Sequence, residues 1–232
     1  MTAADHGKVT VGLLLLEDGR MGLPGAIRHP DTFPRRVVGT VPGANGRSVL
    51  GTAAGKLTVA YVETARTLVE REGADLLVAD CGYAALYQDG VGAVAPAVLS
   101  SLLWVPLLAR VFAAPLGVLT YDAAALDATR RRSAGWYDDL SVVVADVQDS
   151  ATWRAIVGDP TGELDHAALR RDLVVMVERF TALTRPSALV LECTAMFPFV
   201  AEVRRACGLP VFELASLARV IASELALTHA TG

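Results

Sequence analysis

Two cysteines stand at matching places in the two halves of this 232-residue chain. Cys81 ends the segment Asp-Leu-Leu-Val-Ala-Asp-Cys, and Cys193, 112 residues later, ends Ser-Ala-Leu-Val-Leu-Glu-Cys. Each follows an apolar run that is typical of a buried strand. Unpaired backbone N–H groups and the positive end of a helix at such a position favour a thiolate, so we expect both thiols to have a lowered pKa.

Two thiols that face each other across a small ligand can move a proton on carbon. One thiolate removes a proton beside a carboxylate or carbonyl, and the opposite thiol returns a proton to the other face, which inverts the centre. N–H and hydroxyl donors hold the charge that develops on the carboxyl group. The alternative is a pair of structural cysteines, because free Cys is among the most buried residue types. Cys207 has no counterpart in the first half and is expected to be structural.

Short apolar runs alternate with longer helical patterns along the chain. Continuous apolar runs are typical of parallel strands covered on both faces, and the alternating order predicts right-handed crossovers in an α/β fold. The expected strands are residues 9–16, 75–80, 93–98, 115–120, 141–145, 187–192 and 209–212. The expected helices are residues 56–72, 99–113, 123–133, 149–157, 164–184, 195–206 and 214–228.

An internal repeat connects the two halves. Besides the cysteine segments, Val-Gly-Leu-Leu at residues 11–14 resembles Leu-Gly-Val-Leu at residues 116–119. Matches in the same order predict two similar lobes, each a parallel sheet flanked by helices. We expect a pseudo-two-fold axis between the lobes, with the site between them. The first lobe is expected to span residues 1–113 plus 213–232 and the second residues 114–212, in one compact unit.

Residues 17–55 are rich in glycine and proline and follow the first expected strand. A loop of this length is usually functional or disordered. It leaves the carboxyl end of the sheet, where α/β proteins bind ligands. We favour a loop that covers the substrate over a flexible excursion on the surface.

Composition excludes several classes of protein. Hydrophobic residues make up 53% of the chain and charged residues 20%, which excludes intrinsic disorder. A net charge of −4 offers no basic excess for nucleic acid. Three cysteines, an odd number, argue against a disulfide framework and favour a reducing cytoplasm. The uncharged stretch 93–109 is shorter than a membrane span and holds two prolines, so no membrane segment is expected.

Further expectations concern metals, assembly and supporting side chains. The four histidines lack ligand spacing, so no metal site is expected, and the surplus of apolar residues favours a homodimer or higher homo-oligomer.

Hydroxyl groups just past strand ends could bind a carboxylate, although helix capping or packing between the lobes explains them equally. These candidates are Ser100, Ser101, Tyr83 and Tyr121. Asp80 and Glu192 precede the cysteines and are expected to point to the opposite side of their strands. The run Arg130–Arg132 predicts a solvated helix end.

Taken as a set, several segments resemble the aspartate/glutamate/hydantoin racemase superfamily over nearly the whole chain. These are Ala79–Tyr83, Ser100–Leu102 leading to Val105–Leu108, Gly117–Thr120, Leu191–Thr194 and Leu209–Phe212, with His29–Phe33 similar to a loop of an uncharacterised branch. The resemblance implies two α/β lobes and cofactor-independent proton transfer by Cys81 and Cys193. It also implies that Thr194 helps to bind the substrate carboxylate.

The chain departs from the amino-acid racemases at two positions that recognise polar substrate groups. Gly82-Tyr83 stands where Asn-Thr is typical, and Ala195 stands where Glu is common. These differences favour a bulkier or more apolar substrate than aspartate or glutamate. Three functions stay open: a racemase or epimerase of a small chiral carboxylate, such as an amino acid or hydantoin; a decarboxylase or cis-trans isomerase of a small dicarboxylic acid; and a non-catalytic protein that binds a small acid.

Overall fold

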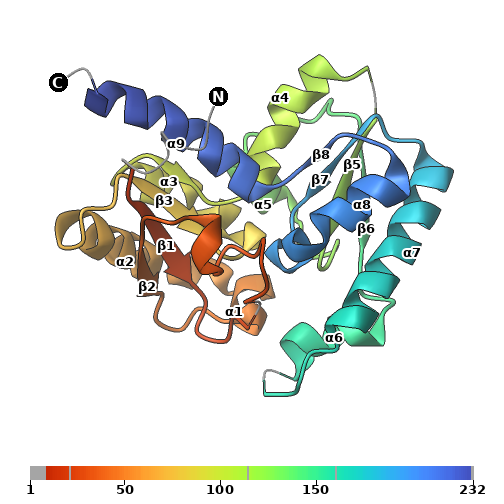
Figure 1. Ribbon diagram of the computed structural model, residues 1–232, viewed down its shortest axis with the longest axis horizontal. Helices are drawn as coiled ribbons and strands as arrows, with labels where there is room; N and C mark the ends of the chain where they lie inside the picture. Colours follow the sequence, from red (N-terminus) through yellow and green to blue (C-terminus); the bar gives the residue numbers. More distant parts are fainter. Residues whose placement is uncertain (1–8, 21, 114, 160, 231–232) are drawn as a thin grey trace.

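Two four-stranded parallel sheets form the computed structural model, which describes residues 9–20, 22–113, 115–159 and 161–230. Their strand orders are β2-β1-β3-β4 and β6-β5-β7-β8, so the two sheets have the same topology. The expected two-lobed α/β fold is confirmed (Figure 1). The first sheet contains β1 (Val11–Leu15), β2 (Arg36–Thr40), β3 (Leu76–Ala79) and β4 (Ala97–Val98). The second contains β5 (Leu116–Thr120), β6 (Val142–Asp146), β7 (Ala188–Leu191) and β8 (Val211–Phe212).

The register of the central strands confirms the internal repeat. Gly12 of β1 pairs with Leu77 of β3, and Gly117 of β5 pairs with Leu189 of β7. A Cβ at Gly12 would lie 2.9 Å from Leu77 Cδ2, and one at Gly117 would lie 2.5 Å from Leu189 Cδ2. In each sheet, the missing side chain of the glycine therefore leaves room for a leucine of the neighbouring strand. The packing between the two central strands is the same in both sheets.

Helices cover both sheets (Figure 1). In the first lobe, α2 lies against β1 and β2, while in the second lobe α7 packs on α8, which contacts β8. The longer helices are α2 (Thr58–Glu70), α4 (Trp104–Val111), α6 (Ala151–Gly158), α7 (His166–Thr184), α8 (Val200–Cys207) and α9 (Leu214–Ala230). The shorter ones are α1 (Gly46–Leu50), α3 (Gln88–Gly92) and α5 (Ala128–Ser133), with 3-10 turns η2 (Pro30–Thr32), η3 (Ala54–Leu57), η4 (Gly82–Tyr87), η5 (Ser101–Leu103) and η6 (Thr194–Phe199).

The last helix, α9, returns from the second sheet and packs against β3 and β4 of the first (Figure 1). Its buried side is a stripe of residues four apart, Leu214, Ala218, Ala222 and Ala226. Spacing of this kind puts the side chains on one face of a helix, and alanines let that face approach the sheet closely.

The structure corrects the expectation of a long irregular loop at residues 17–55. This segment contains β2, α1 and the turns η2 and η3. The sequence did not reveal β2 because it is a half-exposed edge strand with Gly39 in it, so it lacks a continuous apolar run. The expected helix 123–133 begins only at Ala128, where the side chain of Asp127 caps it.

The expected strand at residues 93–98 is reduced to the two residues of β4. Of the described helices, none combines the length and the apolar character that a membrane crossing requires.

Candidate functional site

A cavity lies between the two sheets, where β3 and β7 end. It encloses about 800 Å³ of space between atoms, part of which is open to solvent. Both cysteines of the repeat line it, together with residues of the 17–55 segment, of α6 (Ala151–Gly158) and of the chain that follows α6. The apolar part of the wall is formed by Leu16, Ala26, Ile27, Val49, Leu50, Ile156, Val157 and Leu164.

The two cysteines occupy equivalent places in the two lobes. Cys81 is the second residue after the end of β3 and directly precedes η4. Cys193 has the same position between β7 and η6. Both have extended backbone conformations and neither side chain caps its helix. The backbone N–H of Tyr83 lowers the pKa of Cys81, and the backbone N–H groups of Ala195 and Met196 lower that of Cys193. The fold thus brings both thiols to one cavity with backbone donors beside each.

The expected low pKa of these thiols is wrong. Burial raises the pKa of Cys81 well above its usual value, and the nearby Glu192 and Asp80 carboxyls raise it further. Burial and Glu192 likewise raise the pKa of Cys193. The backbone N–H groups lower both pKa values, as expected, but desolvation and the two carboxyls outweigh them.

Asp80 points into the cavity, which contradicts the expectation that it would face away. Strand β3 ends at Ala79, so the alternation of side chains no longer applies at residue 80. Oδ2 of Asp80 pairs with Nε of Arg28, and Oδ1 accepts a hydrogen bond of 2.9 Å from the N–H of Leu16. Burial raises the pKa of Asp80 to about 6 despite the Arg28 guanidinium, which lowers it.

Glu192 also lines the cavity, again because its strand, β7, has already ended. The residue is fully buried, and Oε2 accepts a 2.6 Å hydrogen bond from the Thr120 hydroxyl. The Tyr83 hydroxyl lies 2.6 Å from Thr120 Oγ1 and 2.8 Å from the backbone N of Asp122. Burial raises the pKa of Glu192 to about 7, although the hydrogen bond from Thr120 and the charge of Arg130 lower it.

Four of the six expected substrate-binding residues line the cavity: Gly82, Tyr83, Tyr121 and Thr194. Their polar groups are partly engaged within the protein. The Thr194 hydroxyl donates to the carbonyl of Asp80, and so joins the two lobes. The Tyr121 hydroxyl donates to the carbonyl of Arg154 at 3.1 Å.

Ser100 and Ser101 lie outside the cavity wall and are fully buried. The Ser100 hydroxyl accepts from the N–H of Leu102, which is the capping role considered above. Ser101 donates to the carbonyl of Leu191, the last residue of β7. Both hydroxyls therefore support the elements behind the site.

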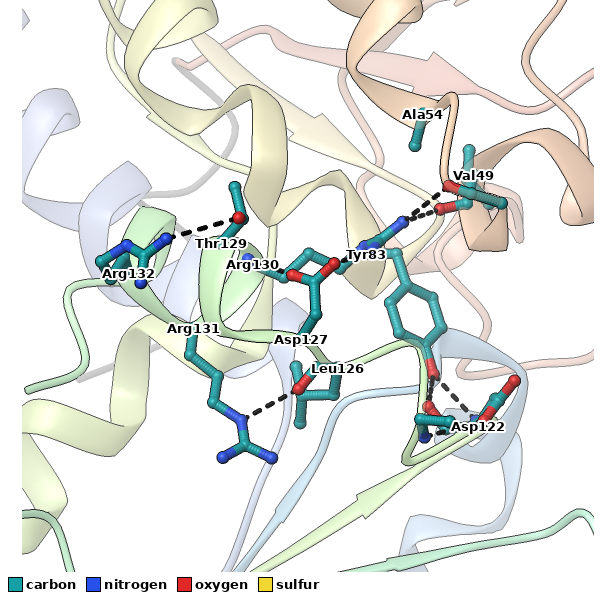
Figure 2. Close-up of polar contacts among 12 residues, drawn as sticks. Val49, Ala54, Tyr83, Asp122, Leu126, Asp127, Thr129, Arg130, Arg131 and Arg132 are labelled. Atoms are coloured by element: carbon teal, nitrogen blue, oxygen red, sulfur yellow. Dashed lines mark hydrogen bonds and ion pairs between the residues drawn. The ribbon is translucent and has the colours of Figure 1, made fainter. Parts of the chain in front are cut away.

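The expectation of a solvated helix end at residues 130–132 is wrong for Arg130, which is only 4% exposed (Figure 2). Its guanidinium donates to the carbonyl of Val49 at 2.6 Å, pairs with Asp127 at 2.9 Å and lies over the Tyr83 ring, 5.6 Å from the centroid. Because Arg131 and Arg132 are exposed, only the first arginine faces inward. Figure 2 shows it reaching from α5 to the 17–55 segment.

The 17–55 segment is also tied to the second lobe by two other arginines. Arg20 donates to the carbonyls of Gly162, Ala155 and Ile156, the last two at 3.3 and 3.2 Å. Arg47 donates to the carbonyl of Gly158 at 3.1 Å. These contacts hold the 17–55 segment, which contributes to the cavity wall, against the second lobe.

Several site residues were not expected from the sequence. Arg28, Asp80 and Glu192 are charged residues in the cavity wall. For Asp80 and Glu192, the sequence contains a signal, because each directly precedes one of the repeated cysteines. In the described part of the chain, no group of three or more His, Cys, Asp or Glu side chains is arranged to hold a metal ion. The polar groups around the thiols can instead bind a small acid and exchange protons with it.

Comparisons with known sequences give distant relatives. No family model matches the chain. A dimethylsulfoniopropionate lyase from Durusdinium sp. clade D is 24% identical over 217 residues, which cover 88% of this chain and 71% of that protein. Dimethylsulfoniopropionate lyase 5 from Emiliania huxleyi is 29% identical over 181 residues, which cover 67% of this chain and 34% of that protein.

Solved structures resemble the chain over almost its full length. A glutamate racemase isoform from Bacillus anthracis has a TM-score of 0.62 at 15% identity and covers 95% of this chain and 82% of its own. Allantoin racemase from Pseudomonas fluorescens has a TM-score of 0.58 at 17% identity, with 94% and 92% covered. A glycine-to-cysteine mutant of arylmalonate decarboxylase has a TM-score of 0.59 at 16% identity, with 94% and 93% covered. The protein therefore has the two-lobed fold of the aspartate, glutamate and allantoin racemases, and the resemblance inferred from its sequence is confirmed at the level of the fold.

Proposed function

We propose that the protein is a cofactor-independent racemase or epimerase of a small chiral carboxylate, such as an amino acid or a hydantoin-like compound. The observation that carries this proposal is the placement of Cys81 and Cys193 at equivalent strand ends of two similar lobes, in the wall of one cavity. A non-catalytic binding protein has no need of two such thiols.

In the proposed mechanism, one cysteine acts as thiolate and the other as thiol. The thiolate takes the proton from the carbon beside the carboxyl group, and the electron pair of the broken C–H bond delocalises into that group. The other thiol then delivers its proton to the opposite face, which leaves it as the thiolate for the reverse turnover. Backbone N–H groups at the starts of η4 and η6 are placed to stabilise thiolate and developing oxyanion charge.

The cavity wall supports a substrate with an apolar arm. Leu16, Ile27, Val49 and Val157 contribute apolar surface to the cavity wall, which also contains charged groups. A wall of this composition suits a carboxylate that carries an alkyl or aryl group. It agrees with the two departures from the amino-acid racemase pattern at Gly82-Tyr83 and Ala195.

Solvent deuterium exchange tests the proposal directly. A panel of chiral 2-substituted acids and hydantoins is incubated with the protein in D₂O, and the α-proton is followed by NMR. We expect exchange and loss of optical rotation with at least one compound, with at least a thousandfold loss of rate in Cys81→Ala and in Cys193→Ala, the order expected for removal of a group that acts in concert with others. Cys207→Ala is the matched control and should keep the rate. Absence of exchange across the panel, with both cavity thiols still open to alkylation, would contradict the proposal.

A lyase or decarboxylase is the second candidate, because the curated relatives are lyases of dimethylsulfoniopropionate and one structural neighbour is a decarboxylase. Either reaction passes through negative charge on the same carbon and needs one cysteine as the proton donor or acceptor. Release of carbon dioxide or of an alkenoic acid, with one of the two cysteine variants still active, would favour this candidate. A compound that stabilises the protein against heat without exchange or release would identify a binding protein.

We also propose that the protein forms a homodimer or higher homo-oligomer and acts in the cytoplasm. Large apolar side chains that are more than half exposed, among them Val59, Leu107 and Val111, support a further interface. Sedimentation equilibrium of the purified protein measures its mass in solution and so tests whether it forms a homo-oligomer.

A further inference from the structure

The Glu192 carboxyl is a buried polar group with only one of its oxygens satisfied. The residue has no exposed surface and lines the cavity. Oε2 accepts from Thr120, whereas Oε1 has no hydrogen-bond partner among the described residues. Because an unpaired buried oxygen of this kind is costly, it points to a ligand atom or a proton that completes the site.

A chain of hydroxyls fixes which oxygen is free. Thr120 has one hydroxyl proton, and it goes to Glu192 Oε2. The Tyr83 hydroxyl also has one proton, with two acceptors in reach: Thr120 Oγ1 at 2.6 Å and the carbonyl of Asp122 at 2.8 Å. Its oxygen accepts from the N–H of Asp122. With the Thr120 proton on Oε2, the short contact between Tyr83 and Thr120 takes its proton from Tyr83. Oε2 thus serves as an acceptor, so a proton on this carboxyl belongs on Oε1.

Gly82 makes room for that oxygen. A Cβ at residue 82 would lie 2.3 Å from Glu192 Oε1 and 2.3 Å from its carbonyl oxygen. Gly82 follows Cys81 and Glu192 precedes Cys193, so Oε1 occupies the space of a missing side chain beside both cysteines. Any side chain at residue 82 would displace it.

We propose that Glu192 carries a proton on Oε1 and donates it in a hydrogen bond to the carboxylate of the bound substrate, with Thr120 and Tyr83 as the residues that hold it in this orientation. This rests on the proposed function, since it assumes that a carboxylate lies beside the thiols. A neutral carboxylic acid can strengthen such a bond as charge develops on the substrate oxygen, whereas an ionised one would repel the substrate.

The charge balance of the cavity supports a neutral Glu192. Burial raises its pKa to about 7, and its ionised form raises the pKa of both cavity thiols. The ionisable groups that face it or share its cavity are Asp18, Arg20, Arg28, Asp80, Cys81, Tyr83, Tyr121, Arg130 and Cys193. Of these, Asp80 also titrates near neutrality, with a pKa of about 6, so a test must separate the two carboxyls.

Alkylation of the cavity thiols by a matched pair of reagents makes the test independent of turnover. In both iodoacetate and iodoacetamide, the thiolate sulfur bonds to the CH₂ carbon and iodide leaves. Iodoacetate carries a carboxylate that is ionised throughout pH 6 to 8.5, whereas iodoacetamide is neutral. The ratio of their rates at Cys81 and Cys193, measured by peptide mass spectrometry, cancels the ionisation of the thiol and reports recognition of the carboxylate.

We expect the iodoacetate-to-iodoacetamide ratio to fall about tenfold in the wild type as pH rises through 7, the size of one charge-assisted hydrogen bond. Glu192→Gln, which mimics the neutral acid, should lose the fall through pH 7 and keep only a smaller change near pH 6, where Asp80 titrates. Asp80→Asn should keep the wild-type fall, and Cys207 in the same samples should give a flat ratio.

Three results would overturn the proposal: a flat ratio in the wild type, an undiminished fall in Glu192→Gln, or a fall that disappears only in Asp80→Asn. A flat ratio is measured on the wild type alone, so this outcome can contradict the proposal even if a variant does not fold. A pH-dependent ratio without deuterium exchange on any acid would retain Glu192 as a carboxylate-binding residue and would reject the racemase function instead.

Discussion

At the scale of single residues, the site gathers acidic groups whose pKa values are raised by burial. Both thiols, Glu192 and Asp80 have raised pKa values, and burial is the largest cause in each case. Both thiols are therefore mostly protonated at neutral pH. A substrate carboxylate that accepts a hydrogen bond from Glu192 would keep the proton on this carboxyl, and a neutral Glu192 does not raise the pKa of the thiols as the ionised form does.

The raised carboxyl pKa values predict an unusual dependence of stability on pH. Glu192 shifts from its ordinary 4.5 to about 7 in the folded protein, so the folded state holds this proton more tightly than the unfolded state. Its stabilising contribution is complete below the unfolded pKa and is lost as pH rises through the folded one. We expect Glu192 alone to lower the free energy of unfolding by about 2–4 kcal/mol between pH 4 and pH 8.

Urea denaturation at both pH values measures this effect. The comparison is between the wild type and Glu192→Gln, which has no proton to lose, while all other titrating groups are common to both proteins. The variant should lose less stability on going to pH 8. Equal losses in the two proteins would mean that Glu192 does not titrate in this range.

At the scale of secondary-structure elements, helix α5 joins the two lobes through one side chain. Arg130 is held by Asp127, the Val49 carbonyl and the Tyr83 ring (Figure 2). A lysine cannot reproduce the planar, forked set of donors. We expect Arg130→Lys to lower the free energy of unfolding by about 2 kcal/mol. Arg132→Lys, on the exposed side of the same helix, is the matched control and should change it by less than about 0.5 kcal/mol. Chemical denaturation of the two variants would show equal stabilities if the buried contacts were unimportant.

Elements with continuous apolar runs could be predicted from the sequence, and so could the cysteines that follow them. Strands β1, β3, β5 and β7 are buried on both faces, so their composition alone marks them. The edge strand β2 could not be found in this way, because half-exposed residues and a glycine carry no such pattern. The inward orientation of Asp80 and Glu192 depends on the residue at which each strand ends, which is set by the following 3-10 turn and not by the strand itself.

Side chains that reach between lobes were the other unpredictable feature. Arg130 sits in a run of three arginines, and nothing local distinguishes the buried one from its exposed neighbours. Its partner, the Val49 carbonyl, is 81 residues away in sequence. Contacts of this kind depend on how two elements are placed in space, which apolar periodicity does not report.

At the scale of the whole molecule, the 17–55 segment connects the two lobes and forms part of the cavity wall. Arg20 makes three of its contacts to the second lobe. We expect Arg20→Ala to raise the rate of amide hydrogen exchange in residues 17–28 about tenfold or more, because each lost hydrogen bond contributes about 0.5–1.5 kcal/mol. Mass spectrometry of peptides from this segment measures the effect.

Arg35→Ala, at an exposed position of the same segment, is the control and should exchange at the wild-type rate. If the two variants exchange alike, the contacts of Arg20 do not hold the segment in place. In an active enzyme, Arg20→Ala should also raise KM more than it lowers kcat, since it acts on closure and not on the thiols.

The path of α9 has a consequence for how the molecule is made. The ribosome releases residues 9–98, which hold the whole first sheet, long before it makes the helix that packs on β3 and β4. Until residue 230 has left the exit tunnel, the face of β3 and β4 that α9 covers stays exposed, while the second sheet between residues 116 and 212 can already be complete. Vectorial synthesis therefore favours a chain in which the later lobe matures first, and a nascent protein stalled before α9 presents an apolar surface for chaperones to bind.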